Sequence, residues 1–237
     1  MVEHVREDDP RITAQETTYK GTTGTIKGHL AKPKEIDKLP GIIVIHENRG
    51  LTPHIKEVAR RFSLEGYIAL APDALSSSGG TPKDRDQARD QIYQLDMEKT
   101  VMDFVAAVEY LKNLPESTGK IGVTGFCWGG GVTNQVAVKS KDVTAAAPFY
   151  GIQPDTEDVP KIQASMLLHY AGDDERINAG IDEYVKALRE ADISYEVIIY
   201  EGAKHAFFND TSERYHKEAA EKAWKETLRF FEEHLKP

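Results

Sequence analysis

The 237-residue chain contains a single cysteine, Cys127, so no disulfide can form within it. A lone thiol is typical of proteins kept in a reducing compartment, and we expect this protein in the cytoplasm. No segment approaches the roughly 18 consecutive apolar residues of a membrane span. Residues 1–10 also lack the apolar centre of a secretory signal. The sequence therefore predicts neither a membrane protein nor an exported one.

Positive charge is outnumbered by negative charge. The chain has 30 Lys and Arg residues against 39 Asp and Glu residues, which gives a formal net charge of −9. Binding to nucleic-acid phosphates needs a clustered cationic surface. The acidic excess therefore argues against nucleic acid as a partner.

What the sequence does contain is an alternation of apolar strand-like runs and amphipathic helix-like segments. With 40% hydrophobic residues and no linker, the chain suits a single domain over residues 1–237. The alternation predicts an α/β fold, with a mostly parallel sheet, helices on both faces and ligands bound at the carboxyl edge. Residues 1–13 are expected to be a mobile start, and 73–81 a flexible loop. Expected strands are 41–46, 67–72, 120–124, 144–150, 165–170 and 195–200, after an antiparallel hairpin at 14–33; expected helices are 53–65, 83–114 with a break near Asp96, 181–190 and 215–235.

Glycines surround the cysteine in the segment Gly125-Phe126-Cys127-Trp128-Gly129-Gly130-Gly131. This pattern after a strand is typical of the G-x-S-x-G nucleophile elbow of α/β-hydrolases, with cysteine at the serine position. Such a turn exposes the central side chain and aims the next amide, that of Trp128, at the same space. The alternative is a small buried cysteine beside a glycine-rich turn.

An α/β-hydrolase also needs an acid and then a histidine after the nucleophile, each in a loop that follows a strand. Residues 165–170 lead into Asp173 and Asp174, and residues 195–200 lead into a loop with His205. Taken alone, His205 is an ordinary loop histidine, and Asp174 is a turn residue or a helix N-cap. Their order and their matching strand contexts favour a hydrolase triad.

Five segments together make the chain similar to the dienelactone hydrolase family, the cysteine-dependent branch of the α/β-hydrolase fold. The resemblance extends from about residue 19 to the C-terminus. The matching segments are the elbow, Ile42-Ile43-Val44-Ile45-His46-Glu47, Asp96-Met97-Glu98, Tyr150-Gly151 and Gly202-Ala203-Lys204-His205.

The resemblance implies that Cys127 is the nucleophile, His205 the base and Asp174 the acid that orients the base. Asp173 is the rival for the acid. We prefer Asp174 because the family's acid stands three residues before an apolar position, which Ile177 fits.

The resemblance further implies that Glu47 holds the resting thiol until substrate displaces it. The alternatives for Glu47 are capping a helix and pairing with Arg49. The backbone amides of Trp128 and Asn48 match the family's oxyanion hole.

Substrate recognition is where the chain departs from the family pattern. The family member that acts on dienelactone holds the substrate carboxylate with arginines and with a serine beside the catalytic histidine. Here the corresponding positions carry Ala206 and Asn209, whereas Arg85 matches one of the arginines. Arg85 is also explained as a solvated member of a charged run, and Arg49 and Arg89 are rival cations.

The resulting hypothesis is a hydrolase that cleaves a small-molecule ester or enol-lactone through an acyl-enzyme thioester. The alternatives are a broad-specificity carboxylesterase or thioesterase, and a non-catalytic ligand-binding protein on the same fold. We expect a monomer or small homo-oligomer. No cofactor or metal is implied, because the histidines at 46, 54, 169, 205 and 216 lack the spacing of a known metal site.

Overall fold

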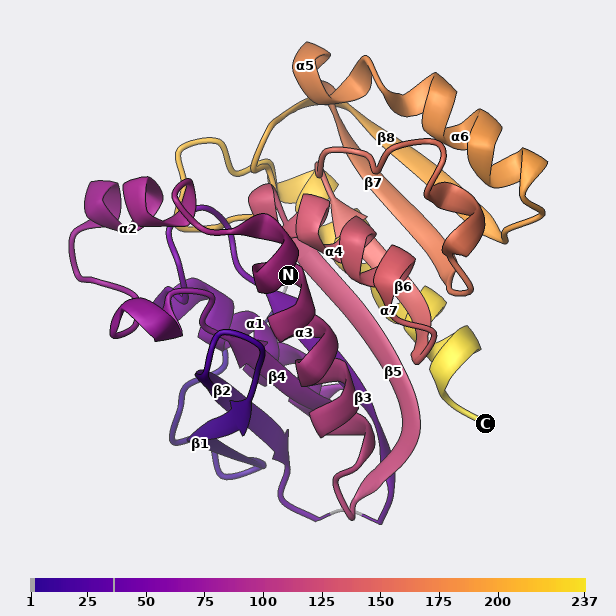
Figure 1. Cartoon of the computed structure of the whole chain (residues 1–237). Coiled ribbons are helices and arrows are strands. Elements are labelled where there is room, and N and C mark those ends of the chain that lie inside the picture. The colour runs from indigo at the N-terminus through magenta and orange to yellow at the C-terminus, as the bar shows by residue number, and fades with distance from the viewer. Residues whose placement is uncertain (1–2, 36) are drawn as a thin grey trace. The chain divides into compact units, whose positions relative to one another are not determined.

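The computed structural model describes residues 3–35 and 37–237; residues 1, 2 and 36 lie outside the described part. The described chain forms two compact units, one of residues 3–121 and one of residues 122–237. Figure 1 shows the elements along the chain. The single domain suggested by the sequence stays a prediction.

Four strands build the sheet of the first unit, in the order β1-β2-β4-β3. They are β1 (Ile12–Lys20), β2 (Thr25–Pro33), β3 (Leu39–Ile45) and β4 (Ile68–Pro72). β1 and β2 pair in antiparallel register from Ile12 opposite Pro33 to Lys20 opposite Thr25. β2 is also antiparallel to β4, whereas β3 and β4 are parallel. The predicted N-terminal antiparallel hairpin is therefore confirmed.

Helices α1 (Pro53–Leu64), α2 (Arg85–Ile92) and α3 (Met97–Lys112) belong to the same unit. Both α1 and α3 pack on the sheet, and Figure 1 shows α3 in front of it and α1 behind. The predicted break near residue 96 separates α2 from α3. There Asp96 caps α3 by accepting a hydrogen bond from the Lys99 amide at 3.2 Å.

The second unit is built on parallel strands. It holds the end of β5 (Ser117–Phe126), then β6 (Val143–Phe149), β7 (Ser165–Asp173) and β8 (Tyr195–Lys204). β6 is parallel to β7, and β7 to β8. Helices α4 (Trp128–Lys139) and α7 (Lys217–Leu235) pack against β6, which explains why that strand is almost wholly apolar and buried. Helices α5 (Glu175–Asn178) and α6 (Ile181–Glu190) follow β7.

Part of the segment expected to be mobile packs on the rest of the first unit. Val5 is buried, and its amide donates a hydrogen bond to Glu57 at 3.2 Å. Residues 1 and 2 of that segment lie outside the described residues, and the mobility of the segment stays a prediction. Among the described helices, none is both long and apolar enough to cross a membrane.

The loop at residues 73–81 is held at both ends. The carboxylate of buried Asp73 accepts hydrogen bonds from the amides of Leu75 and Thr81, at 3.0 and 2.7 Å. Its Oδ1 also accepts the Thr81 hydroxyl at 2.8 Å. Between these contacts lies a short 3-10 turn, η1 (Ser76–Ser78). The loop that we expected to be flexible is thus tied together by one buried carboxylate.

Candidate active site

Cys127 lies in a strained turn between a strand and a helix. β5 ends at Phe126, and α4 begins at Trp128. The backbone of Cys127 has φ 58° and ψ −116°, a conformation that costs free energy for any residue with a Cβ. A strained residue at this point of the chain is the hallmark of a nucleophile elbow. The Cys127 side chain is half-buried.

The glycines around the cysteine allow α4 to approach the sheet closely. A Cβ on Gly125 would lie 2.3 Å from the Gly129 carbonyl oxygen, and a Cβ on Gly130 would lie 2.4 Å from the Phe149 carbonyl oxygen. Gly151 meets Gly130 in the same way, with its Cβ position 2.2 Å from the Gly130 carbonyl carbon. Contacts this short leave no room for a side chain, so both glycine segments follow from one close approach.

The N-terminus of α4 starts directly after the nucleophile. The amides of Gly130 and Gly131 donate to the Cys127 carbonyl oxygen at 3.0 and 3.2 Å, which closes the first turn. Trp128 is the first helical residue, and the free amides of a first turn form the positive end of the helix dipole. This arrangement favours negative charge beside Cys127.

His205 is held by a buried carboxylate. Its Nδ1 donates a hydrogen bond to Oδ2 of Asp174, which is 8% exposed and follows β7 at the N-cap of α5. The neighbouring Asp173 is exposed and lies opposite Lys204 in the register of β7 and β8. Of the two aspartates, the structure therefore brings Asp174 to the histidine.

An aromatic side chain also packs against this histidine. The ring centroid of Tyr150 lies 5.0 Å from that of His205, and the two planes are inclined by 57°. Tyr150 has φ 38°, and Ala206, the residue after the histidine, has φ 70°. Phe207 extends the cluster, with its ring 5.3 Å from Tyr150. Two positive φ values and two aromatic rings thus fix the histidine loop.

One pair of residues contacts both the elbow and the histidine. The Cys127 amide donates to the carbonyl oxygen of Phe149 at 3.0 Å, and Phe149 is followed by Tyr150, whose ring packs on His205. The end of β6 therefore contacts both candidate catalytic residues. In the sequence, the Tyr150-Gly151 pair stands out only as a family motif, because a positive φ at a tyrosine leaves no signal in one sequence.

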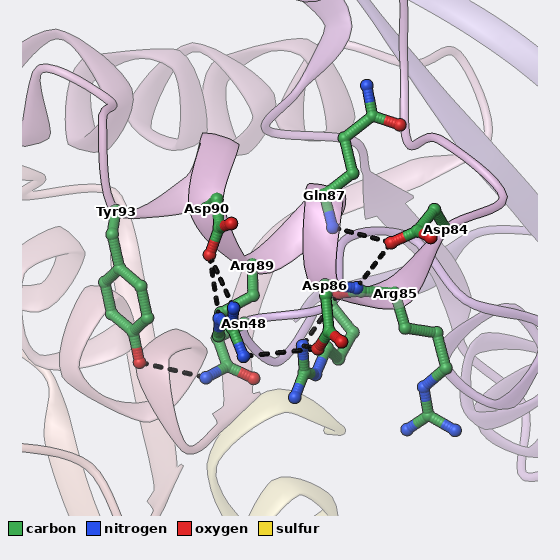
Figure 2. Close-up of polar contacts among 9 residues, drawn as sticks. Asn48, Asp84, Arg85, Asp86, Gln87, Arg89, Asp90 and Tyr93 are labelled. Atoms are coloured by element: carbon green, nitrogen blue, oxygen red, sulfur yellow. Dashed lines mark hydrogen bonds and ion pairs between the residues drawn. The ribbon is translucent and has the colours of Figure 1, made fainter.

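Glu47 and Asn48 lie in the first unit, in the turn that follows β3. Both are half-buried. The Glu47 carbonyl oxygen accepts a hydrogen bond from Nδ1 of His46 at 2.7 Å. The Asn48 side-chain amide donates to the Tyr93 hydroxyl at 2.9 Å, as Figure 2 shows. Neither His46 nor Tyr93 had been assigned a role from the sequence.

The candidate cations near this turn differ in their partners. Arg49 donates to the Asp86 carboxylate at 3.0 Å and to the Arg85 carbonyl oxygen at 2.7 Å. Arg89 pairs with Asp86 at 3.2 Å and with Asp90 at 2.7 Å. Arg85 is exposed, and Figure 2 shows its guanidinium extending away from Asp86. Within the described residues, Arg85 alone of the three arginines has no carboxylate partner.

The chain belongs to the dienelactone hydrolase family, because it matches the model of the Dienelactone hydrolase family over residues 26–235. Protein usf of Aquifex pyrophilus is 35% identical over 89% of this chain and 94% of that protein. A Saccharolobus solfataricus protein provisionally named a carboxymethylenebutenolidase is 32% identical over 91% of this chain and 97% of its own.

A crystal structure supports the same family at the level of the fold. It is that of a Klebsiella pneumoniae protein provisionally named a dienelactone hydrolase, which is 27% identical to this chain and has a TM-score of 0.85. The match covers 93% of this chain and 98% of the other. The predicted family, the predicted α/β-hydrolase fold and the predicted enzyme class are therefore confirmed.

Proposed function

We propose that this protein hydrolyses a small carboxylic ester or lactone through Cys127, His205 and Asp174. The hydrogen bond from His205 Nδ1 to the buried Asp174 carboxylate carries the proposal. A neutral imidazole that donates from Nδ1 has a bare Nε2, which is the form that a general base needs. The strained backbone of Cys127 and the membership of the family support the same chemistry.

The reaction takes two steps. His205 Nε2 accepts the thiol proton, and the Cys127 sulfur attacks the substrate carbonyl carbon. The tetrahedral intermediate then collapses to a thioester, while the leaving oxygen takes the proton from His205. In the second step, His205 takes a proton from water, whose oxygen attacks the thioester carbon. Collapse releases the carboxylic acid and returns the proton to the sulfur.

The amides of Trp128 and Asn48 are the oxyanion donors of this proposal. Each donor acts on charge that develops only in the transition state, and removal of one such donor costs about 3–4 kcal/mol of barrier. We assign Glu47 to the resting enzyme, where its carboxylate holds the thiol until substrate displaces it. Activation of the nucleophile would then wait for the correct ligand.

Arg85 is proposed to bind a carboxylate of the substrate. Its guanidinium is exposed and pairs with no carboxylate among the described residues, whereas Asp86 and Asp90 neutralise the rival cations. Ala206 and Asn209 replace two groups that hold the substrate carboxylate in the family member that acts on dienelactone. With Arg85 alone in this role, we expect the substrate to be an enol-lactone whose carboxylate is held weakly.

The test is turnover of cis-dienelactone and of p-nitrophenyl acetate by the wild type and by Cys127→Ala. We expect the variant to lose at least about 10³-fold in kcat on both substrates. Lys139→Ala, an exposed change on α4, is the matched control and keeps both activities. Activity that survives Cys127→Ala contradicts the mechanism, and ester turnover without lactone turnover contradicts the substrate.

The loss of the two carboxylate-holding groups also favours a second candidate, a broad-specificity carboxylesterase or thioesterase. Faster turnover of p-nitrophenyl acetate than of any lactone would support it. For a non-catalytic binding protein, iodoacetamide would alkylate Cys127 no faster than a free thiol.

A reactive thiol survives best in a reducing compartment, so we also propose that the protein is cytoplasmic. We further propose that it is a monomer or a small homo-oligomer.

A further inference from the structure

A buried histidine beside the candidate oxyanion donor bridges two backbone segments of the first unit. His46 is fully buried between the end of β3 and Glu47. Its Nδ1 lies 2.7 Å from the Glu47 carbonyl oxygen, and its Nε2 lies 3.1 Å from the Ala74 amide nitrogen. The imidazole therefore links the turn after β3 to the loop at residues 73–81.

These two partners fix the protonation of the ring. The Glu47 carbonyl oxygen can only accept a hydrogen bond, so Nδ1 must carry a proton. The Ala74 amide can only donate, so Nε2 must be bare. Burial lowers the pKa of His46 and thereby favours the same neutral form. His46 thus acts as a donor toward the turn and as an acceptor toward the loop.

The Glu47 carbonyl and the Asn48 N–H belong to one peptide group. That group is planar and trans, and no cis peptide bond occurs among the described residues, so the carbonyl and the N–H point in opposite directions in one plane. A donor that fixes the carbonyl oxygen therefore fixes the direction of the Asn48 N–H. The Gly50 amide also approaches this oxygen, but at 3.4 Å, so the contact from His46 is the shorter one.

We propose that His46 is a positioning residue that orients the Asn48 amide for the oxyanion. The inference rests on the proposed function, since it needs the Asn48 amide as an oxyanion donor. Asp73 and Thr81 close the loop that carries Ala74, and the Thr81 hydroxyl also accepts the Leu51 amide at 2.8 Å. The loop therefore holds the imidazole from its far side.

Two substitutions separate the two roles of the ring. In His46→Asn, the amide nitrogen of the side chain can occupy the place of Nδ1 and keep the donor to Glu47. In His46→Gln, the longer side chain reaches the place of Nε2 and keeps the acceptor for Ala74, while the donor to Glu47 is lost. Each variant is polar and removes one hydrogen bond, so the pair is matched.

We expect His46→Gln to lower kcat for p-nitrophenyl acetate about 10- to 100-fold, with KM changed less than about threefold, because a misdirected oxyanion donor acts on the transition state alone. His46→Asn is expected to keep kcat within about threefold of the wild type. Alkylation of Cys127 by iodoacetamide develops no oxyanion, so its rate stays the same in both variants. His29→Gln, which removes a buried histidine of β2, is the control for the loss of an imidazole in the same unit.

Equal loss of kcat in the two His46 variants, or alkylation that falls in parallel with kcat, overturns the inference. If His46→Gln does not fold, the tautomer in the wild type decides: nitrogen NMR must find the proton of His46 on Nδ1, and a proton on Nε2 overturns the inference. Full activity of His46→Gln beside an inactive Cys127→Ala refutes only the role of His46. Activity of Cys127→Ala instead refutes the proposed function.

Discussion

Asp174 accepts a hydrogen bond from Nδ1 of His205, although Asp173 is the residue that continues the β7 ladder beside β8. The alternation of side chains along a strand accounts for the difference, because adjacent residues point in opposite directions. The chain leaves β7 at Asp173, and the next residue turns inward as the N-cap of α5. One carboxylate is thus exposed and the other is buried against the histidine.

This difference predicts unequal effects of two similar substitutions. Asp174→Asn should lower kcat by about 10³- to 10⁴-fold, because an amide no longer holds the imidazole in the tautomer with a bare Nε2. Asp173→Asn should keep kcat within about threefold. Steady-state kinetics on p-nitrophenyl acetate measures both effects. A larger loss of kcat in Asp173→Asn than in Asp174→Asn would show that Asp173 is the acid.

Gly130→Ala tests the close approach of α4 to the end of β6. The added methyl would lie 2.4 Å from the Phe149 carbonyl oxygen, so helix and strand must move apart. Overpacking of this kind costs about 1–3 kcal/mol of unfolding free energy. Urea unfolding measures the loss, and Lys139→Ala on the exposed face of the same helix should stay within about 0.5 kcal/mol of the wild type. Equal stability of the two variants would contradict the close approach.

Buried His169 makes stability depend on pH. Burial lowers the pKa of His169 from 6.5 to about 3. Its ring nitrogens contact the Tyr200 hydroxyl and the Thr227 hydroxyl, each at 2.9 Å. Below pH 6.5 the unfolded chain therefore binds a proton that the folded protein does not. The contribution of this neutral histidine is complete above pH 6.5 and is lost as the pH falls toward 3, at about 1.4 kcal/mol per pH unit.

Unfolding titrations at pH 7 and pH 5 check this expectation. His169→Gln, which does not titrate, should lose about 2 kcal/mol less between those two pH values than the wild type does. Parallel pH dependence in the two proteins would show that His169 accepts a proton while folded.

Arg85→Ala separates recognition of a carboxylate from the chemistry of hydrolysis. The variant should raise KM for cis-dienelactone about tenfold and leave p-nitrophenyl acetate unaffected, because only the lactone carries a carboxylate. Arg89→Ala is the matched control, since Asp86 and Asp90 already pair with that guanidinium. Equal effects of both variants would mean that this surface contributes only its general charge.

The helices and strands were readable from the sequence where apolar spacing and capping residues agree. The helix expected at 53–65 spans Pro53–Leu64, and the helix expected at 181–190 spans Ile181–Glu190. The break at Asp96 was readable because an aspartate can accept from the amide three residues later. Strand β8 extends to Lys204, beyond the apolar run at 195–200, because backbone pairing with β7 resumes at Lys204 opposite Asp173 after a register shift.

The candidate site was only partly readable. Glycine spacing and chain order pointed to Cys127 and His205, but neither could decide which cation is neutralised. That depends on α2, whose Asp86 reaches Arg49 across 37 positions of the sequence. The packing of Tyr150 on His205 and the bridge through His46 could not be predicted from the sequence either. The first joins residues that are distant in the chain, and the second also depends on the tautomer of the ring.

Trapping the acyl-enzyme tests the central claim most directly. The wild type and Cys127→Ala would be mixed with p-nitrophenyl acetate, quenched in acid within the first turnover and digested for mass spectrometry. The account predicts one acetyl group on the peptide that contains Cys127, removable by hydroxylamine as a thioester and absent from the variant. Rapid turnover with no acetylated Cys127 at any quench time, or an acetyl group on another side chain, would contradict it.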